Sequence, residues 1–152
     1  MSDYSFVDFG SGKGRTLLLA SRYALSEIVG VEFAEELHQI AAKNIHNYRA
    51  SGMKCKDLRS EWTDAAAFEI PKNKCVLFFS NPFEPPVLKN VLDNIANSYK
   101  KNPRKMFLVY SEPEYRELFD RLDFVHVRTR FRLLPASILP LAADLLVYET
   151  NQ

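Results

Sequence analysis

This sequence of 152 residues contains few cysteines and histidines and has almost no excess of positive over negative charge. Its two cysteines, Cys55 and Cys75, are too few for a disulfide scaffold, so we expect a reducing, cytoplasmic environment. His38, His46 and His126 have no mutual metal-ligand spacing, and no metal site is expected. The net charge is only +1, which excludes a strongly electrostatic partnership of the whole molecule with nucleic acid or membrane.

Long apolar runs are also lacking. The longest, at residues 133–148, is broken by Pro135, Pro140 and Asp144, so it cannot form a membrane-spanning helix. No basic region followed by an apolar run stands at the N-terminus, so no secretory signal is expected. What is present is 47% apolar and 26% charged residues, the balance of a folded domain. Residues 1–152 are therefore predicted to form a single domain.

Short β-type runs alternate with longer helical patterns along the chain. Strands are expected at residues 4–9, 28–33, 58–63, 75–80, 106–110, 124–133 and 144–149. Helices are expected at 15–23, 34–48, 87–99 and 114–121, the third with an apolar side formed by Val87, Leu88, Val91, Leu92 and Ile95. This alternation predicts an α/β fold with a doubly wound, mostly parallel seven-stranded sheet and helices on both faces. The last two strands have no helix between them, so they are expected to pair antiparallel at one edge.

Three of the five glycines lie between the first strand and the first helix, at Gly10, Gly12 and Gly14. Glycine permits positive φ and close approach of a ligand to the backbone, while a helix N-terminus presents free N–H groups. A phosphate loop would need Ser or Thr after Lys13, where Gly14 stands. The dinucleotide fingerprint would need its third glycine at Arg15. The phosphate-loop pattern therefore does not fit, and the dinucleotide pattern fits only poorly.

The pattern that fits is acidic-x-Gly-x-Gly-x-Gly directly after the first strand. Here the sequence resembles the class I S-adenosylmethionine-dependent methyltransferases, because Asp8, Gly10, Gly12 and Gly14 match that family's cofactor loop position by position. Ser11, between the first two glycines, is a further cofactor-binding candidate. The resemblance implies that the cofactor is S-adenosylmethionine.

The resemblance continues beyond the glycine loop. The second strand reaches Glu32, where the family places an acid that holds both ribose hydroxyls, and a carboxylate can accept two hydrogen bonds from a vicinal diol. Phe33 either covers the adenine or packs in the core. Asp64, followed by Ala65, stands where the family places the group that reads the adenine amine.

Asn81, Pro82 and Phe83 follow the fourth strand, where the family places its substrate-facing motif. They resemble the Asn/Asp/Ser-Pro-Pro-Tyr/Phe motif of enzymes that methylate planar nitrogens, with one proline missing. A fainter similarity to the non-SET lysine methyltransferases runs through residues 30–32 and Phe83. The resemblance therefore implies methyl transfer to a nitrogen of a protein or nucleic acid, with residues 81–83 as the catalytic candidates.

Two other function classes stay open. One is a cofactor-binding but inactive subunit that serves a catalytic partner. The other is a nicotinamide-dependent oxidoreductase, which Arg15 and the antiparallel ending disfavour. The family usually has helices before the first strand, whereas this strand begins almost at Met1, so we expect a bare core that is part of a longer protein or is completed by a partner.

Basic residues alternate with apolar ones in the predicted strand at 124–133, at His126, Arg128, Arg130 and Arg132. Such a strand would carry a basic stripe along one face. If it lies at the sheet edge, charge there prevents edge-to-edge pairing, which we favour over binding of an acidic substrate.

Overall fold

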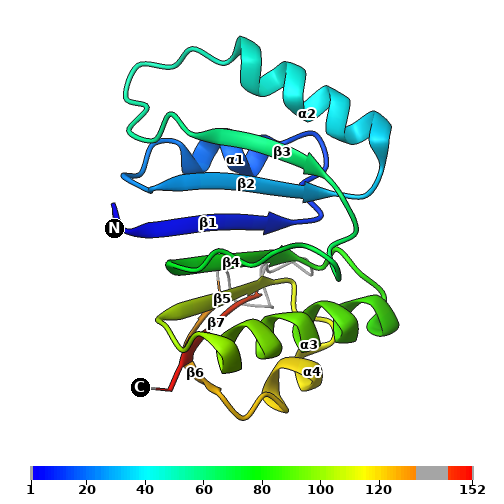
Figure 1. Cartoon of the computed structure of the whole chain (residues 1–152). Coiled ribbons are helices and arrows are strands. Elements are labelled where there is room, and N and C mark those ends of the chain that lie inside the picture. The colour runs from blue at the N-terminus through cyan, green and yellow to red at the C-terminus, as the bar shows by residue number, and fades with distance from the viewer. Residues whose placement is uncertain (1, 133–143, 152) are drawn as a thin grey trace.

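The computed structural model describes residues 2–132 and 144–151 (Figure 1). Its elements in chain order are β1 (Tyr4–Phe9), α1 (Arg15–Ala20), β2 (Glu27–Glu32), α2 (Glu35–Asn47), β3 (Leu58–Trp62), β4 (Lys74–Ser80), α3 (Pro85–Lys101), β5 (Met106–Ser111), α4 (Arg116–Asp120), β6 (Val125–Arg132) and β7 (Asp144–Thr150).

The seven strands form one sheet in the order β3-β2-β1-β4-β5-β7-β6. Strands β1 to β5 run parallel to one another, and β7 runs antiparallel to both β5 and β6. The predicted doubly wound sheet and its antiparallel C-terminal pair are therefore confirmed. The predicted absence of a helix between the last two strands falls on residues 133–143, which lie outside the described residues.

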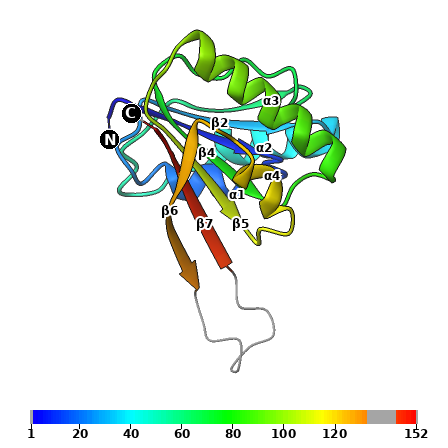
Figure 2. The same cartoon turned by 90° about the horizontal axis from the view of Figure 1, so that it is seen from below.

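Helices α3 and α4 lie on one face of the sheet, as Figure 2 shows from below. The main core lies between them and the strands, and its centre is Phe79 of β4. The Phe79 ring stacks on Phe9 at 4.9 Å between ring centroids and meets the edge of Phe119 at 5.4 Å. A smaller cluster forms on the other face, where Leu17 of α1 packs with Ile28 of β2. These two clusters anchor the strand ends that carry the predicted site.

Strand β4 shows how unequal the two faces are. Cys75, Leu77 and Phe79 point toward α3 and are buried, whereas Val76 and Phe78 on the opposite face are only half-buried. The reason is that the smaller cluster around α1 is centred on β2, to one side of β4. Only one side of this apolar strand is therefore fully covered by the described residues.

All four helices differ from their predicted ranges by one or more residues at an end, and two of these differences have local reasons. Helix α1 ends at Ala20, three residues before its predicted end, because Arg22 and Tyr23 donate to the carbonyls three residues back, instead of four residues back as in an α-helix. Helix α3 begins at Pro85. Proline has no backbone N–H to donate, and the N–H groups of a helix's first turn have no partner within the helix, so proline fits this position. Its residue Val87, predicted to join the apolar side, is instead exposed.

Strand β6 lies at the sheet edge, the position at which its basic residues were expected to prevent edge-to-edge pairing. A bulge between Val127 and Thr129 interrupts its alternation. Arg128 pairs with Glu149 of β7, and Arg130 pairs with Asp144. These two arginines are therefore bound to the neighbouring strand.

Three properties of the described residues bear on function. No helix among them is long and apolar enough to cross a membrane. Within residues 2–132 and 144–151, no group of three His, Cys, Asp or Glu side chains is arranged to hold a metal ion. Cys55 and Cys75 are both buried free thiols, and burial raises the pKa of Cys75 to about 12.

Candidate functional site

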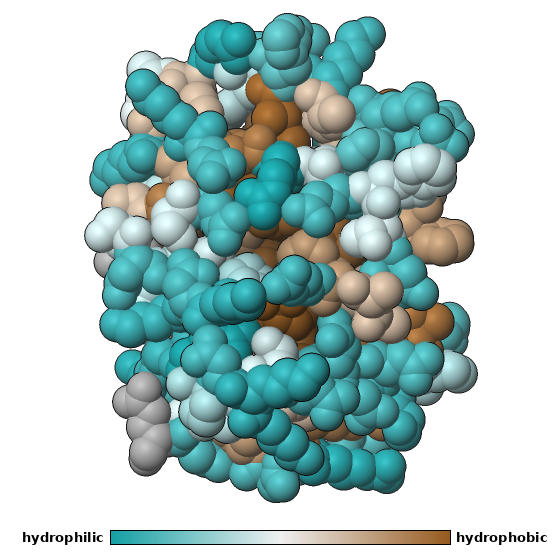
Figure 3. All heavy atoms as spheres, viewed as in Figure 1, coloured by the Kyte–Doolittle hydropathy of each residue, from teal (hydrophilic) through white to brown (hydrophobic). Residues whose placement is uncertain are grey.

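A cavity of about 610 Å³ lies where the carboxyl ends of β1, β2, β3 and β4 come together. In an open α/β sheet this end is where ligands bind. Figure 3 shows apolar side chains exposed at the right-hand edge, toward which these strands point in Figure 1. Most of the predicted site residues line the cavity, namely Gly10, Gly12, Glu32, Phe33, Asp64, Ala65, Pro82 and Phe83.

The first two loop glycines have different structural roles. A Cβ added to Gly10 would lie 2.5 Å from the Pro82 Cβ, so glycine here lets the β1 and β4 loops touch. A Cβ added to Gly12 would meet no atom within 4 Å, so the backbone at Gly12 faces open space. Both adopt positive φ, 74° and 54°, which glycine tolerates. Gly12 is therefore the glycine that leaves room for a ligand.

The Glu32 carboxylate ties the glycine loop to helix α2. It is only 8% exposed, and its Oε2 accepts the Gly12 N–H at 2.8 Å while Oε1 accepts the Ala34 N–H at 2.9 Å. A carboxylate offers about four lone-pair positions, so both oxygens keep capacity for a further donor. Glu32 is thus held rigidly at the cavity wall with acceptor capacity remaining for a diol.

Asp8 lies beneath the site and is not among the residues that line the cavity. Its side chain is buried, and this burial raises its pKa from 3.8 to about 7. A hydrogen bond from Thr16 opposes the rise, and the nearby negative charge of Glu32 adds to it. The structure therefore brings two carboxylates together under the glycine loop.

Ser11 and Gly14, also predicted to bind the cofactor, contact other protein groups. The Ser11 hydroxyl is buried beside Gly30, where an added Cβ would lie 2.5 Å from it, and it has no hydrogen-bond partner among the described residues. An added Cβ on Gly14 would lie 3.2 Å from the Ala41 Cβ of α2. Neither residue lines the cavity, and their roles in cofactor binding stay predictions.

The wall formed after β2 and β3 is largely apolar. Phe33 lies at the cavity with its side chain 76% exposed, so of the two sequence alternatives the structure excludes core packing. Ala65 is buried at the same wall. Asp64 accepts the Ala66 N–H at 2.9 Å through Oδ1, which fixes the turn and holds the carboxylate at the cavity.

The wall formed after β4 carries the predicted catalytic residues. Pro82 and Phe83 line the cavity, whereas Asn81 lies beside it. Asn81 has a φ of 43°, unusual for a residue with a side chain. Its Oδ1 accepts the Tyr110 hydroxyl at 2.9 Å, and its Nδ2 donates to Glu114 Oε2 at 2.8 Å.

Sequence reasoning missed several cavity residues, namely Val31, Leu37, Thr63, Ser80 and Val87. Their common signal is position, since each is within two residues of a predicted strand end or belongs to the first turn of the helix that follows. Val87 was expected on the apolar side of its helix, and Leu37 likewise fits a helical apolar face. A residue in the first turn of a helix lies near the carboxyl end of the preceding strand and can face the cavity. The spacing of apolar residues does not distinguish this position from one in the core.

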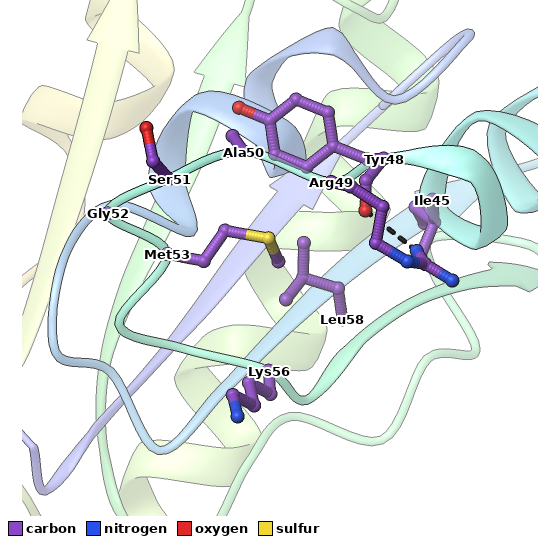
Figure 4. A pocket seen from close by; sticks show the side chains of 9 residues that line it. All are labelled: Ile45, Tyr48, Arg49, Ala50, Ser51, Gly52, Met53, Lys56 and Leu58. Atoms are coloured by element: carbon purple, nitrogen blue, oxygen red, sulfur yellow. Dashed lines mark hydrogen bonds between the residues drawn. The ribbon is translucent and has the colours of Figure 1, made fainter.

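A second hollow, of about 570 Å³, lies near the end of α2 and the start of β3 (Figure 4). Ile45, Met53 and Leu58 form its apolar part, and Arg49 donates to the backbone carbonyls of His46 and Tyr48. It contains none of the predicted site residues. It also opens at the amino end of β3, away from the ends that carry the glycine loop.

Comparison with known proteins supports the fold. No model of a protein family matches the sequence, and no curated protein matches it either. Among solved structures, the N-methyltransferase NodS of Bradyrhizobium japonicum, bound to S-adenosyl-L-homocysteine, aligns with a TM-score of 0.70, 10% identity and coverage of 98% of this chain and 79% of NodS. The magnesium protoporphyrin IX methyltransferase ChlM of Synechocystis, with bound S-adenosylmethionine, aligns with a TM-score of 0.66, 12% identity and coverage of 96% and 69%.

Sp1610 of Streptococcus pneumoniae, described as a candidate tRNA (m1A22) methyltransferase, aligns with a TM-score of 0.67 at 17% identity. The alignment covers 97% of this chain, which spans only 64% of Sp1610. At these identities the similarity concerns the arrangement of the backbone. The chain has the fold of the class I S-adenosylmethionine-dependent methyltransferases.

Proposed function

We propose that the chain is an S-adenosylmethionine-dependent methyltransferase that acts on a nitrogen of a protein or nucleic acid. The observation that carries the proposal is the cavity between Gly12 and Glu32 on one side and Pro82 and Phe83 on the other. It combines an open backbone, a buried carboxylate held by two hydrogen bonds and an apolar wall. A carboxylate suits the hydroxyl groups of a ribose, and an apolar wall suits the flat face of a base.

The residues present fit this cofactor. Glu32 would accept hydrogen bonds from the ribose hydroxyls, Phe33 would cover the adenine ring, and Asp64 would accept a hydrogen bond from the adenine amine. The open backbone at Gly12 leaves space for the amino-acid part. S-adenosylmethionine supplies an electrophilic methyl group on a sulfonium, so the protein must mainly bind, orient and exclude water.

The acceptor side suits an amine. Asn81 and the Glu114 carboxylate bonded to it both carry oxygens that accept hydrogen bonds from an amine and so orient its lone pair. Pro82 fixes the backbone beside them, and Phe83 offers a ring for stacking or for a cation–π contact with the sulfonium. NodS is an N-methyltransferase with the same fold, which agrees with a nitrogen acceptor.

One observation favours the alternative of an inactive cofactor-binding subunit. The Asn81 Oδ1 already accepts the Tyr110 hydroxyl, so its remaining capacity for a substrate amine is reduced. An oxidoreductase stays the less favoured reading, because Arg15 replaces the third fingerprint glycine and β7 is antiparallel.

Calorimetric titration separates these functions. We expect S-adenosylmethionine and S-adenosylhomocysteine to bind, and NAD and ATP not to bind. Binding of NAD alone would contradict the proposal. Transfer of a labelled methyl group to basic peptides or to RNA then distinguishes an active enzyme from an inactive subunit, which would bind the cofactor and transfer nothing.

A further inference from the structure

Trp62, the last residue of β3, holds the peptide group between Phe33 and Ala34. Its indole Nε1–H donates to the Phe33 carbonyl at 2.9 Å. The N–H at the other end of that peptide group, on Ala34, donates to Glu32 Oε1 at 2.9 Å. A single peptide group is therefore fixed from both sides, by an indole on β3 and by the buried carboxylate that ends β2.

The Phe33 ring is placed at the cavity without being buried by the protein. It lines the cavity yet is 76% exposed, so a ligand in the cavity is what would cover it. Trp62 does not line the cavity itself. Its connection to a bound ligand passes through the backbone that it shares with Phe33.

We propose that Trp62 is a positioning residue for the adenosine part of the cofactor, acting through the Phe33 peptide. The inference rests on the proposed function, because it requires an adenosyl ligand in the cavity. Backbone that is ordered before binding loses no conformational freedom when the ligand arrives, so the pre-set ring raises affinity. Because parallel pairing aligns Trp62 with Glu32, the strand register itself brings the indole to this peptide.

The test is Trp62→Phe, which keeps an aromatic ring at the edge strand and removes the N–H. Calorimetry measures affinity for S-adenosylmethionine and for 5′-methylthioadenosine, which contains the adenosine but lacks the amino-acid part. Loss of one neutral hydrogen bond predicts affinity lower by about threefold to tenfold. Both ligands should lose the same factor, because the effect acts on the adenosine.

A double-mutant cycle shows whether Trp62 acts through Phe33. The Phe33→Ala variant removes the ring, so Phe33→Ala combined with Trp62→Phe should bind no more weakly than Phe33→Ala alone. The control is Tyr23→Phe, at another exposed aromatic residue that is not among the cavity residues, and it should leave both affinities unchanged. Thermal unfolding of every variant checks that the fold is kept. Trp62 is the only tryptophan, so its fluorescence in the unmodified protein should also change on titration with either ligand.

The outcomes are separable. Tight binding by the unmodified protein with unchanged affinity in Trp62→Phe would overturn the positioning role and leave the proposed function intact. Losses that multiply in the double variant would also overturn it, because Trp62 would then act independently of Phe33. An unmodified protein that binds neither ligand would overturn the proposed function and this inference with it.

Discussion

The two walls of the cavity solve the same backbone problem in different ways. Behind β1 the chain turns on glycines, with Gly10, Gly12 and Gly14 at positive φ. Behind β4 the residue at positive φ is Asn81, at 43°, a conformation that is less favourable for a residue with a side chain than for glycine. The side formed by the glycine loop and Glu32, here called the cofactor wall, therefore turns on glycines, whereas the side formed after β4 by residues 81–83, the acceptor wall, turns on a residue with a side chain.

Their polar groups differ in the same sense. Glu32 is buried and bonded by two backbone N–H groups, which cannot move without the loop. Asn81 is bonded by the side chains of Tyr110 and Glu114, which can rotate to new partners. We infer that the cofactor wall is set before binding and that the acceptor wall adjusts when the substrate arrives. Four predictions test this contrast.

The largest expected effect is on folding stability as a function of pH, through Asp8, which is buried beneath the cofactor wall. Its folded pKa of about 7 lies above the unfolded value of 3.8, so folding stability falls as the pH rises from about 4 to about 7. Asp8→Asn should be as stable as the unmodified protein near pH 3 and more stable at pH 8, by on the order of 3 kcal/mol. Urea unfolding of both proteins at both pH values measures this difference. Equal stability of the Asn variant at pH 8 would contradict it.

The second prediction concerns turnover. Asn81→Ala should lower the methyl-transfer rate by roughly 10²-fold, since misplacement of a reacting group costs about that much, and should spare cofactor affinity. The paired measurements are calorimetry and a transfer rate on any acceptor found. Asn81→Gly is the matched control, because it also lacks the side chain but relieves the positive φ. Both variants should be equally slow and both lose the bonds to Tyr110 and Glu114, but Asn81→Ala should be the less stable of the two because alanine keeps the cost of positive φ. Full turnover in either would contradict the acceptor role.

The third prediction is a loss of cofactor affinity in Glu32→Ala. Each charge-assisted hydrogen bond to a ribose hydroxyl contributes roughly 1.5–3 kcal/mol, so binding should weaken by at least about tenfold. Gly12→Val should weaken binding as much, because its side chain would fill the open space at this glycine. Calorimetry with S-adenosylhomocysteine measures both, and unchanged affinity in both would remove the site assignment.

The smallest effect separates two glycines of one loop. Gly10→Ala places a methyl group against Pro82 and should cost stability by about 1 kcal/mol more than Gly12→Ala, which meets only open space. Both variants place alanine at a positive φ, which costs stability in each. The difference between their free energies of unfolding therefore reports the contact between the two walls. Denaturant unfolding gives the two free energies. Equal free energies of unfolding would mean that the contact with Pro82 does not affect stability.

Local patterns in the sequence were enough for the order of strands and helices, the glycine loop after β1 and the acid that ends β2. The reason is that periodicity, glycine placement and chain order act over a few neighbouring residues. The same patterns misjudged Leu37 and Val87, which fit apolar helical faces but lie at the cavity. The sequence determines which residues share a helical face. Whether a residue in the helix's first turn lies in the core or at the cavity depends on where the strands of the sheet end.

Only the tertiary structure decided how the site is held together. The bond from Trp62 to Phe33 and the bond from Tyr110 to Asn81 each join residues 29 positions apart, and the contact of Gly10 with Pro82 joins two strand ends. Such contacts depend on strand order and register, which place distant segments side by side. Because no local pattern encodes that juxtaposition, the sequence alone indicated which groups bind, and the fold determined what positions them.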